Sequence, residues 1–525
     1  MNGGSSTKQN TSGQRLAHLR ERLPAILPTY LPAQRWFAGK AARIDSVKIL
    51  DVVPLDVIAA DAAVFLVRVQ YASGLQETYA LPLIALSEGC PPEMRAAPLT
   101  AGKLECGDVE LIDALQSDTF LNALLKGFVQ PQSFDGAFGR AEMKSSVNLA
   151  QALAGPGETL QGQLLKSEQS NSSIHYGERL ILKLFRRLSE GVNPELEMGE
   201  FLSSRAGFSN TPHVLGSMTY TRHPTGQFSL AVLQEFVPND GDAWHYTLVQ
   251  FAHFLAAAQQ AEGSAPALED RWFGAYLADA EELGRTTAGM HLALASDAQH
   301  SDFAPEPWSE SLKREVVQNW CDFAGRVFEL LRHNIPRLPE QLQDVAKAMS
   351  AREDEVIRIF QSLSGQDFGG MLMRVHGDYH LGQVLHSSSK FVIIDFEGEP
   401  ARPIAERRAK QSALKDVAGM LRSFDYAAHS ADLDPLGDAI HPTSGAGRRA
   451  PLVDSWRSRV QERFLSGYLA TAGRAQFLPE TSDQFSKLLK VYLLEKAIYE
   501  LQYELNSRPE WVGIPLGGIK RLLDS

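Results

Sequence analysis

Residues 376–383 read HGDYHLGQ, and residues 393–397 read IIDFE. The first stretch contains Asp378 and, five residues later, the amide Gln383, while the second contains another carboxylate, Asp395. Between them lie two mostly apolar runs separated by three serines, a pattern that predicts a β-hairpin. Such a hairpin brings Gln383 and Asp395 to the same end. Either aspartate alone fits an ordinary turn, but the whole set at this spacing indicates a functional site.

The spacing is typical of protein kinases, in which H-R-D-x-x-x-x-N precedes D-F-G. In that chemistry Asp378 faces the acceptor hydroxyl, while Gln383 and Asp395 face a metal that bridges the phosphates of ATP. Gln383 replaces the kinase asparagine, and Glu397 stands in place of the kinase glycine. Glu397 adds a carboxylate near the metal, either as a ligand of a second ion or to orient the loop. We therefore expect ATP and Mg²⁺ as cofactors, with oxygen ligands for Mg²⁺.

The composition is that of an ordinary soluble globular protein, with 44% hydrophobic and 22% charged residues. A chain of 525 residues has room for two or three packed units. The net charge of −12 argues against nucleic acid or an anionic membrane as a partner. Three widely separated cysteines predict neither a disulfide framework nor a metal-binding motif. No apolar run is long enough to span a membrane, and we expect a cytoplasmic protein.

The chain divides by pattern into a tail and three regions, which predict an α+β, two-lobed protein-kinase-like fold. Residues 1–14 are polar and lack the apolar core of a secretory signal, so we expect a disordered tail. Residues 15–100 predict a β-rich N-terminal cap, and residues 101–240 predict an ATP-binding N-lobe. Residues 241–525 predict a mainly helical C-lobe with the catalytic loop and the sugar site. Its expected helices are 245–258, 276–294, 312–333, 342–363 and 488–506, where apolar residues recur at three- and four-residue spacing.

An ATP-binding lysine is expected in the N-lobe, and Lys183 is the candidate. It interrupts the apolar strand LILKLF at residues 180–185 and would grip the α- and β-phosphates. A lone lysine in such a run also fits an edge strand with its charge in water. Upstream, Ser170, Ser172 and Ser173 lie where a phosphate loop is expected, although no G-x-G is present. Their hydroxyl and backbone N–H groups could cradle phosphates, but Ser/Asn clusters are often simple turns.

A helix beginning at Pro194 offers a carboxylate partner for this lysine. We choose Glu197, with Glu195 and Glu200 as alternatives, because kinases pair the strand lysine with a helix glutamate. Glutamates in a first turn also simply favour the helix dipole. The segment QEFVP at residues 234–238 follows an apolar strand and ends at a proline. It predicts a hinge in which the backbone of Glu235 and Val237 binds adenine.

The sequence resembles the bacterial maltokinases, which belong to the aminoglycoside-phosphotransferase-like kinases. The resemblance covers nearly the whole chain after the tail. It rests on QRWFAGK at 34–40, EQSNSS at 168–173, LKLFRR at 182–187, residues 376–385, IDFEGEP at 394–400, KDVAGMLRSFDY at 415–426, EKA at 495–497 and RPEW at 508–511. The H-G-D-x-H-x-x-Q element occurs in many small-molecule kinases of this fold, whereas the cap sequence and F-E-G-E-P are narrower. The resemblance implies transfer of the ATP γ-phosphate to the anomeric hydroxyl of maltose, on a route towards α-glucan or trehalose.

Two groups of residues are candidates for binding the sugar. Lys496, Tyr499 and Tyr503 recur at three- and four-residue spacing, so they share one face of a helix. Aromatic rings suit the apolar patches of a glucose ring, although this stripe also fits packing within the lobe. Arg422 and Asp425 lie in a stretch that carries the family resemblance and are candidates of equal standing.

Three alternatives stay open at this point: a kinase for another sugar, an antibiotic phosphotransferase and an inactive kinase-like protein. Other sugar or aminoglycoside kinases, such as glucosamine kinase, share the loop motif but are expected to lack the cap sequence. An inactive kinase-like binding protein is an alternative of another class. Lys183, Asp378, Gln383 and Asp395 occur together, which argues against it. Maltose and ATP are the expected partners, and association with trehalose- or glucan-forming enzymes stays open.

Overall fold

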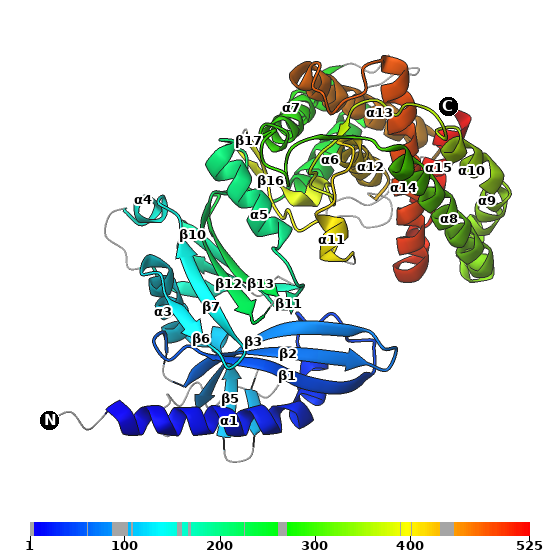
Figure 1. The fold of residues 1–525 in the computed structure, drawn as a ribbon. Coiled ribbons are helices and arrows are strands. Elements are labelled where there is room, and N and C mark those ends of the chain that lie inside the picture. Colours follow the sequence, from blue (N-terminus) through cyan, green and yellow to red (C-terminus); the bar gives the residue numbers. More distant parts are fainter. Residues whose placement is uncertain are drawn as a thin grey trace. The chain divides into compact units, whose positions relative to one another are not determined.

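The computed structural model describes residues 5–59, 61–86, 103–106, 109–154, 160–165, 170–224, 226–260, 270–388, 390–400, 402–430 and 446–525. Strands dominate the N-terminal part and helices the C-terminal part, which confirms the predicted fold class (Figure 1). The chain forms two compact units. The first consists of Met1–Ser204 with Pro212–Pro238, and the second of Arg205–Thr211 with Asn239–Ser525.

The first unit begins with a helix packed on an antiparallel sheet. The helix is α1 (Ser5–Tyr30), and the sheet contains β1 (Ile44–Pro54), β2 (Ala62–Tyr71), β3 (Gln76–Leu86), β4 (Lys103–Cys106), β5 (Val109–Asp113) and β11 (Arg187–Leu188). The order is β1-β2-β3-β5-β4, and β11 pairs with β3. Leu19, Leu23 and Leu27 of α1 are buried in the core beneath this sheet.

Two boundaries differ from those expected from the sequence. Helix α1 begins at Ser5, inside the stretch 1–14 that we expected to be disordered. A helix that is anchored by buried leucines extends readily, because each added residue contributes one hydrogen bond. The cap sheet also continues past residue 100, since β5 pairs with β3 from Leu83↔Asp113 to Leu86↔Glu110.

The aromatic pair of the cap sequence is part of this core. Trp36 and Phe37 are buried, and both rings lie against Tyr79, with centroid distances of 6.0 and 5.1 Å. The Arg186 guanidinium lies 4.7 Å from the centroid of Trp36, and its Nη2 donates to Asp113 at 2.6 Å. The segment is therefore anchored by apolar burial and by one buried ion pair.

A second antiparallel sheet forms the rest of the first unit. Its strands are β6 (Ser133–Asp135), β7 (Gly139–Ser145), β8 (Gly162–Leu164), β9 (Asn171–Tyr176), β10 (Leu180–Phe185), β12 (Val214–Arg222) and β13 (Gln227–Glu235), in the order β6-β7-β12-β13-β10-β9-β8. The accompanying helices are α3 (Asp118–Val129), α4 (Leu149–Leu153) and α5 (Pro194–Glu200). Leu180, Leu182 and Leu184 are buried on one face of the sheet, in the same core as α3.

The second unit is helical, with two small two-stranded antiparallel sheets, of which β16–β17 is a hairpin. The helices are α6 (Ala243–Gln260), α7 (Tyr276–Leu294), α8 (Glu310–Asn334), α9 (Glu340–Ser350), α10 (Glu353–Gln361), α11 (Ile404–Arg407), α12 (Leu414–Ser430), α13 (Ala446–Ala472), α14 (Ser482–Ser507) and α15 (Gly513–Asp524). The strands are β14 (Glu306–Pro307), β15 (Met371–Leu372), β16 (Val384–Ser387) and β17 (Lys390–Ile393). Within the described residues, no helix is long and apolar enough to cross a membrane.

One predicted helix is wrong. The stretch 342–363 forms two helices, α9 and α10, which are separated at Ala351 and Arg352. Both pack on α8, but α9 also contacts α15, whereas α10 contacts α14. The break lets each segment turn its apolar face towards its own partner. Helix α12 packs against α6, α13, α14 and α15.

Candidate active site

The predicted hairpin is present and joins the two halves of the motif. β16 and β17 pair from Val384↔Ile393 to Ser387↔Lys390, and the Ile394 N–H donates to the Gln383 carbonyl at 3.0 Å. Gln383 and Asp395 thus lie at the same end, as expected. Asp395 has φ of +65°, a left-handed conformation that non-glycine residues adopt at a cost of about 1–3 kcal/mol.

Side chains of helix α12 hold the loop that carries Asp378 through hydrogen bonds to its backbone. Asp416 accepts hydrogen bonds from the backbone N–H groups of His376 at 2.7 Å and Gly377 at 2.9 Å. Ser423, two turns later, accepts one from the Leu381 N–H at 3.1 Å. Burial alone would raise the pKa of Asp416, but hydrogen bonds from His291 and from the loop hold it below its usual value. The carboxylate is therefore ionised and fixes the loop by charge-assisted bonds.

Asp416 is not among the site residues predicted from the sequence, although its pattern carries a signal. A lone aspartate at the start of an apolar helix must find partners when it is buried. Its second neighbour is His291 of α7, whose Nε2 lies 3.1 Å from Asp416 Oδ2 and whose Nδ1 lies 2.9 Å from the Tyr468 hydroxyl. These contacts connect α7 and α13 to the same loop.

The two histidines of the motif shape the loop. His376 is buried, and its Nε2 lies 2.9 Å from the Ile394 carbonyl, so it ties the loop to the end of the hairpin. His380 Nδ1 accepts from the Gly382 N–H at 3.1 Å and begins the 3₁₀ turn Leu381–Gln383. Burial lowers the pKa of His380, in spite of the nearby carboxylates, which keeps the ring neutral and able to accept this bond.

The donor set fits Mg²⁺. Gln383 and Asp395 offer an amide and a carboxylate oxygen at one end of the hairpin, and both are half-buried. Within the described residues, no three His, Cys, Asp or Glu side chains gather closely enough to hold a metal by themselves. Mg²⁺ does not require such a cluster, because one or two carboxylates usually share it with substrate phosphates. Glu397 is half-buried, and its carbonyl accepts from Arg407 Nη1 at 3.0 Å.

Two of the predicted sugar-binding residues lie beside Asp378. Lys496 Nζ is 3.8 Å from Asp378 Oδ1, and it lies 4.8 Å from the centroid of the Tyr499 ring. Burial raises the pKa of Tyr499, and the charge and hydrogen bond of Glu399 add to the shift. Glu399 also accepts from Arg402 Nε at 2.5 Å. One face of α14 and the F-E-G-E-P segment therefore meet next to Asp378.

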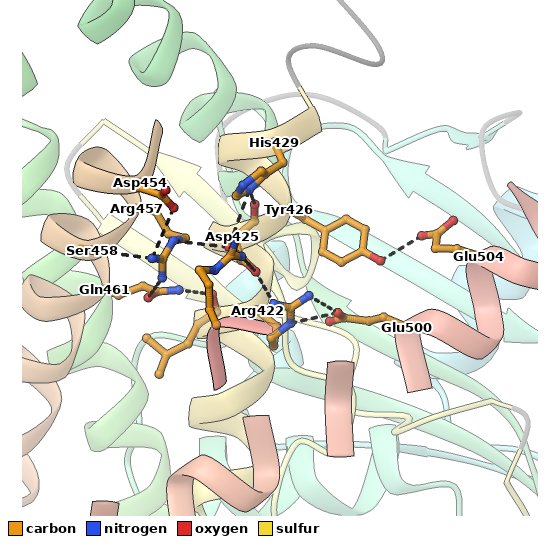
Figure 2. A network of polar contacts seen from close by, with 12 residues as sticks. Arg422, Asp425, Tyr426, His429, Asp454, Arg457, Ser458, Gln461, Glu500 and Glu504 are labelled. Atoms are coloured by element: carbon orange, nitrogen blue, oxygen red, sulfur yellow. Dashed lines mark hydrogen bonds and ion pairs between the residues drawn. The ribbon is translucent and has the colours of Figure 1, made fainter. Parts of the chain in front are cut away.

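The other three sugar-binding candidates lie elsewhere. Tyr503 is 50% exposed and lies under the Arg508 guanidinium, which is 5.5 Å from its ring centroid. Arg422 and Asp425 are 4% and 2% exposed and bind each other inside a network of polar contacts (Figure 2). Because their polar atoms face protein partners, we assign both residues a structural role in place of direct sugar contact.

The residues predicted to bind the nucleotide lie in the first unit. Because successive side chains of a strand point to opposite faces of the sheet, the register shows which of these residues share a face. Lys183 of β10 pairs with Ser173 of β9 and with Val232 of β13, so these side chains share one face of the sheet. Ser172 points to the opposite face, where its Oγ accepts from Arg186 Nε at 2.8 Å. We therefore move Ser172 from phosphate binding to structural support. Ser170 is exposed just before β9, and the preceding residues 166–169 lie outside the described residues.

The glutamate candidates and the hinge lie near the same strands. Glu195 is buried and accepts from Gln234 Nε2 at 3.3 Å, and Gln234 pairs with Ile181 on the Lys183 face. Glu197 is half-buried on the same helix and stays our candidate, with Glu195 as the alternative on the Lys183 face. Glu235 ends β13, where its N–H donates to the His213 carbonyl at 2.9 Å. Val237 follows it, directly before the end of the first unit at Pro238.

Comparison with known proteins places the cap in a described family. Residues 30–116 match the maltokinase N-terminal cap domain. The chain is 27% identical over 358 residues to a glucosamine kinase of Streptacidiphilus jiangxiensis, covering 66% of this chain and 70% of that protein. It is 26% identical over 360 residues to a glucosamine kinase of Mycolicibacterium smegmatis, covering 68% and 78% of the two chains.

Solved structures show a similar fold over most of the chain. Glucosamine kinase in complex with glucosamine, ADP and inorganic phosphate matches with a TM-score of 0.60 and 20% identity, over 91% of this chain and 94% of that one. Crystal form B of glucosamine kinase matches with a TM-score of 0.63 and 21% identity, over 96% and 99%. The chain has this kinase-like fold and carries a maltokinase N-terminal cap. The cap match extends to residue 116, in agreement with the position of β4 and β5 in the first sheet.

Proposed function

We propose that the protein is an ATP-dependent sugar kinase that phosphorylates maltose at its anomeric hydroxyl, giving maltose 1-phosphate. The observation that carries the kinase assignment is the catalytic loop. Asp378 stands on a loop fixed by Asp416, and Gln383 and Asp395 meet at the end of the following hairpin. Lysine and aromatic side chains next to Asp378 supply a surface that suits a sugar.

Each residue has a definite task in this chemistry. Asp378 accepts the proton of the sugar hydroxyl, or orients it, a role worth roughly 10²–10⁴-fold in rate. Gln383 and Asp395 would hold Mg²⁺, which neutralises charge on the phosphates when it is bound. Lys183 would bind the α- and β-phosphates. Positioning and charge dominate phosphoryl transfer, which explains why the fixed loop geometry matters most.

The choice of maltose over glucosamine rests on the F-E-G-E-P segment, which supplies Glu399, a hydrogen-bond partner of Tyr499 beside Asp378. The cap does not separate the two acceptors, contrary to the expectation from the sequence, because crystal form B of glucosamine kinase matches over 96% of this chain and therefore over most of residues 30–116. Glucosamine is the second candidate acceptor, because the relatives in the comparison are described as glucosamine kinases. An inactive binding protein would have no need of Asp378, Asp395 and Lys183 together in one sequence.

Phosphorus NMR separates these acceptors. Purified protein would be incubated with ATP, Mg²⁺ and either maltose or glucosamine, and the spectrum recorded with proton coupling. A phosphate on the anomeric carbon couples to one proton and gives a doublet, whereas a phosphate on a CH₂–O group gives a triplet-like signal. The Asp378→Asn variant is the control for contaminating kinases. Turnover of glucosamine without turnover of maltose would refute the maltose assignment but leave the kinase assignment standing.

The proposed product belongs to a wider route. The family resemblance implies that maltose 1-phosphate would enter a path to α-glucan or trehalose, and enzymes of that path are candidate partners. The cytoplasmic location expected from the sequence stays a prediction, which fractionation of the source cells would test.

A further inference from the structure

A buried ion pair joins α12 to α14. Helix α12 binds the backbone of the loop that carries Asp378, and α14 carries Lys496. Arg422 of α12 donates to Glu500 Oε2 of α14 through Nε at 2.9 Å and through Nη2 at 2.5 Å (Figure 2). The two side chains are 4% and 11% exposed. Neither residue contacts Asp378 in any interaction described above, so the pair must act through the helices that it connects.

One end of this connection is the catalytic loop. Asp416 and Ser423 of α12 bind the loop backbone on both sides of Asp378. Between them, Gly419 lies so close to the loop that a Cβ atom would be 2.5 Å from the Tyr379 carbonyl oxygen. The position of the loop is therefore determined by α12.

The other end is the acceptor side of the site. Glu500 follows Lys496 by four residues on α14, so the two side chains lie on the same face of the helix. Lys496 Nζ lies 3.8 Å from Asp378 Oδ1, and Tyr499 is one residue before Glu500. A shift of α14 relative to α12 would change the distance between the sugar-site residues and the catalytic aspartate.

The Arg422 guanidinium is itself held in place. Asp425 binds its Nη1 and also accepts from Arg521 Nη2, while Arg457 Nε lies 3.5 Å from the same carboxylate. Burial opposes ionisation of Asp425, but these guanidinium groups keep its pKa below the usual value. Gly518 of α15 leaves room for the side chain, since a Cβ there would be 2.2 Å from Arg422 Nη1. Asp425 and Glu500 thus hold the Arg422 guanidinium from α12 and from α14.

We propose that Arg422 and Glu500 are positioning residues, which set the acceptor side of the site against Asp378 by locking α14 to α12. Buried ion pairs contribute little net stability compared with apolar pairs of similar size, but they require one geometry of their partners. Since the pair connects to the acceptor side of the site, its removal raises the KM for the sugar and leaves the KM for ATP unchanged. The assignment rests on the proposed sugar-kinase function.

The test compares the change in KM for the sugar with the change in KM for ATP. The double variant Arg422→Met with Glu500→Leu removes both charges together, and Asp425 keeps Arg521 and Arg457 as partners. We expect KM for the sugar to rise about tenfold and kcat/KM for the sugar to fall about 10²-fold, because small displacements of reacting groups cost this much. KM for ATP should stay within about twofold. Glu500→Gln, which still offers Arg422 an acceptor oxygen, should keep the sugar KM within about threefold of wild type.

Arg457→Met is the matched control. It removes another guanidinium from Asp425, but α13, on which it lies, packs against α7 and α12. It should lower Tm without changing the sugar KM. If the double variant does not fold, Glu500→Asp keeps the charge, shortens the side chain and should raise the sugar KM. An unchanged sugar KM in the folded double variant or in Glu500→Asp, or equal rises of the KM for sugar and for ATP in either of them, would overturn the assignment. Wild type that phosphorylates no sugar would instead overturn the proposed function, and this assignment with it.

Discussion

Replacing Asp416 by asparagine should impair catalysis without touching a group that meets substrate. Its Oδ2 accepts from the His376 N–H, and its Oδ1 accepts from the Gly377 N–H, at 2.7 and 2.9 Å. Asparagine has one acceptor oxygen, so its NH₂ group must oppose one of these two backbone donors. A buried N–H left without an acceptor costs about 1–3 kcal/mol. If the displaced loop raises the activation free energy by about 2 kcal/mol, kcat decreases about 30-fold.

The assay would measure kcat and both KM values for folded Asp416→Asn, with Tm recorded by differential scanning fluorimetry. Asp51→Asn is a matched control, because Asp51 is also a fully buried carboxylate that accepts several hydrogen bonds. Its donors are the N–H groups of Val52, Ala137 and Phe138 and the Tyr220 hydroxyl, all in the first unit. Both variants should lose thermal stability, but only Asp416→Asn should lose kcat. A kcat within threefold of wild type, or equal losses in both variants, would refute the positioning role.

Further outcomes follow from the same structure. Asp378→Asn and Asp395→Asn should each abolish Mg²⁺-dependent ATP consumption while circular dichroism shows folded protein, and near wild-type turnover in either would exclude that residue. Trp36→Ala should lower the free energy of unfolding by about 3–5 kcal/mol in denaturant titrations, because it empties a buried site, and loss of turnover at unchanged stability would contradict this. The pKa of His380 is lowered from 6.5 by burial, so the unfolded state binds its proton more tightly. Stability should therefore fall as pH decreases below about 6.5, and His380→Asn, which does not titrate, should show a smaller decrease in the same titrations.

The local part of the site could be predicted from the sequence. The spacing between Asp378, Gln383 and Asp395 and the apolar runs between the last two predicted a hairpin, because strand pairing over a short turn is decided by neighbouring residues. Lys183 in its apolar strand was found for the same reason. Period-two alternation would also have separated Ser172 from Ser173, since successive strand residues face opposite sides of a sheet.

The partners that hold the site came only from the tertiary structure. Asp416 meets the loop forty residues before it in the chain, and Arg422 meets Glu500 seventy-eight residues after it. Apolar periodicity shows that two segments are helices and which face is buried, but it does not say which helix lies against which. A buried charge has only one set of partners that satisfies it, and that set depends on helix packing. Sequence alone therefore indicated the reacting groups, whereas the packing of α12 against α14 decided how they are held.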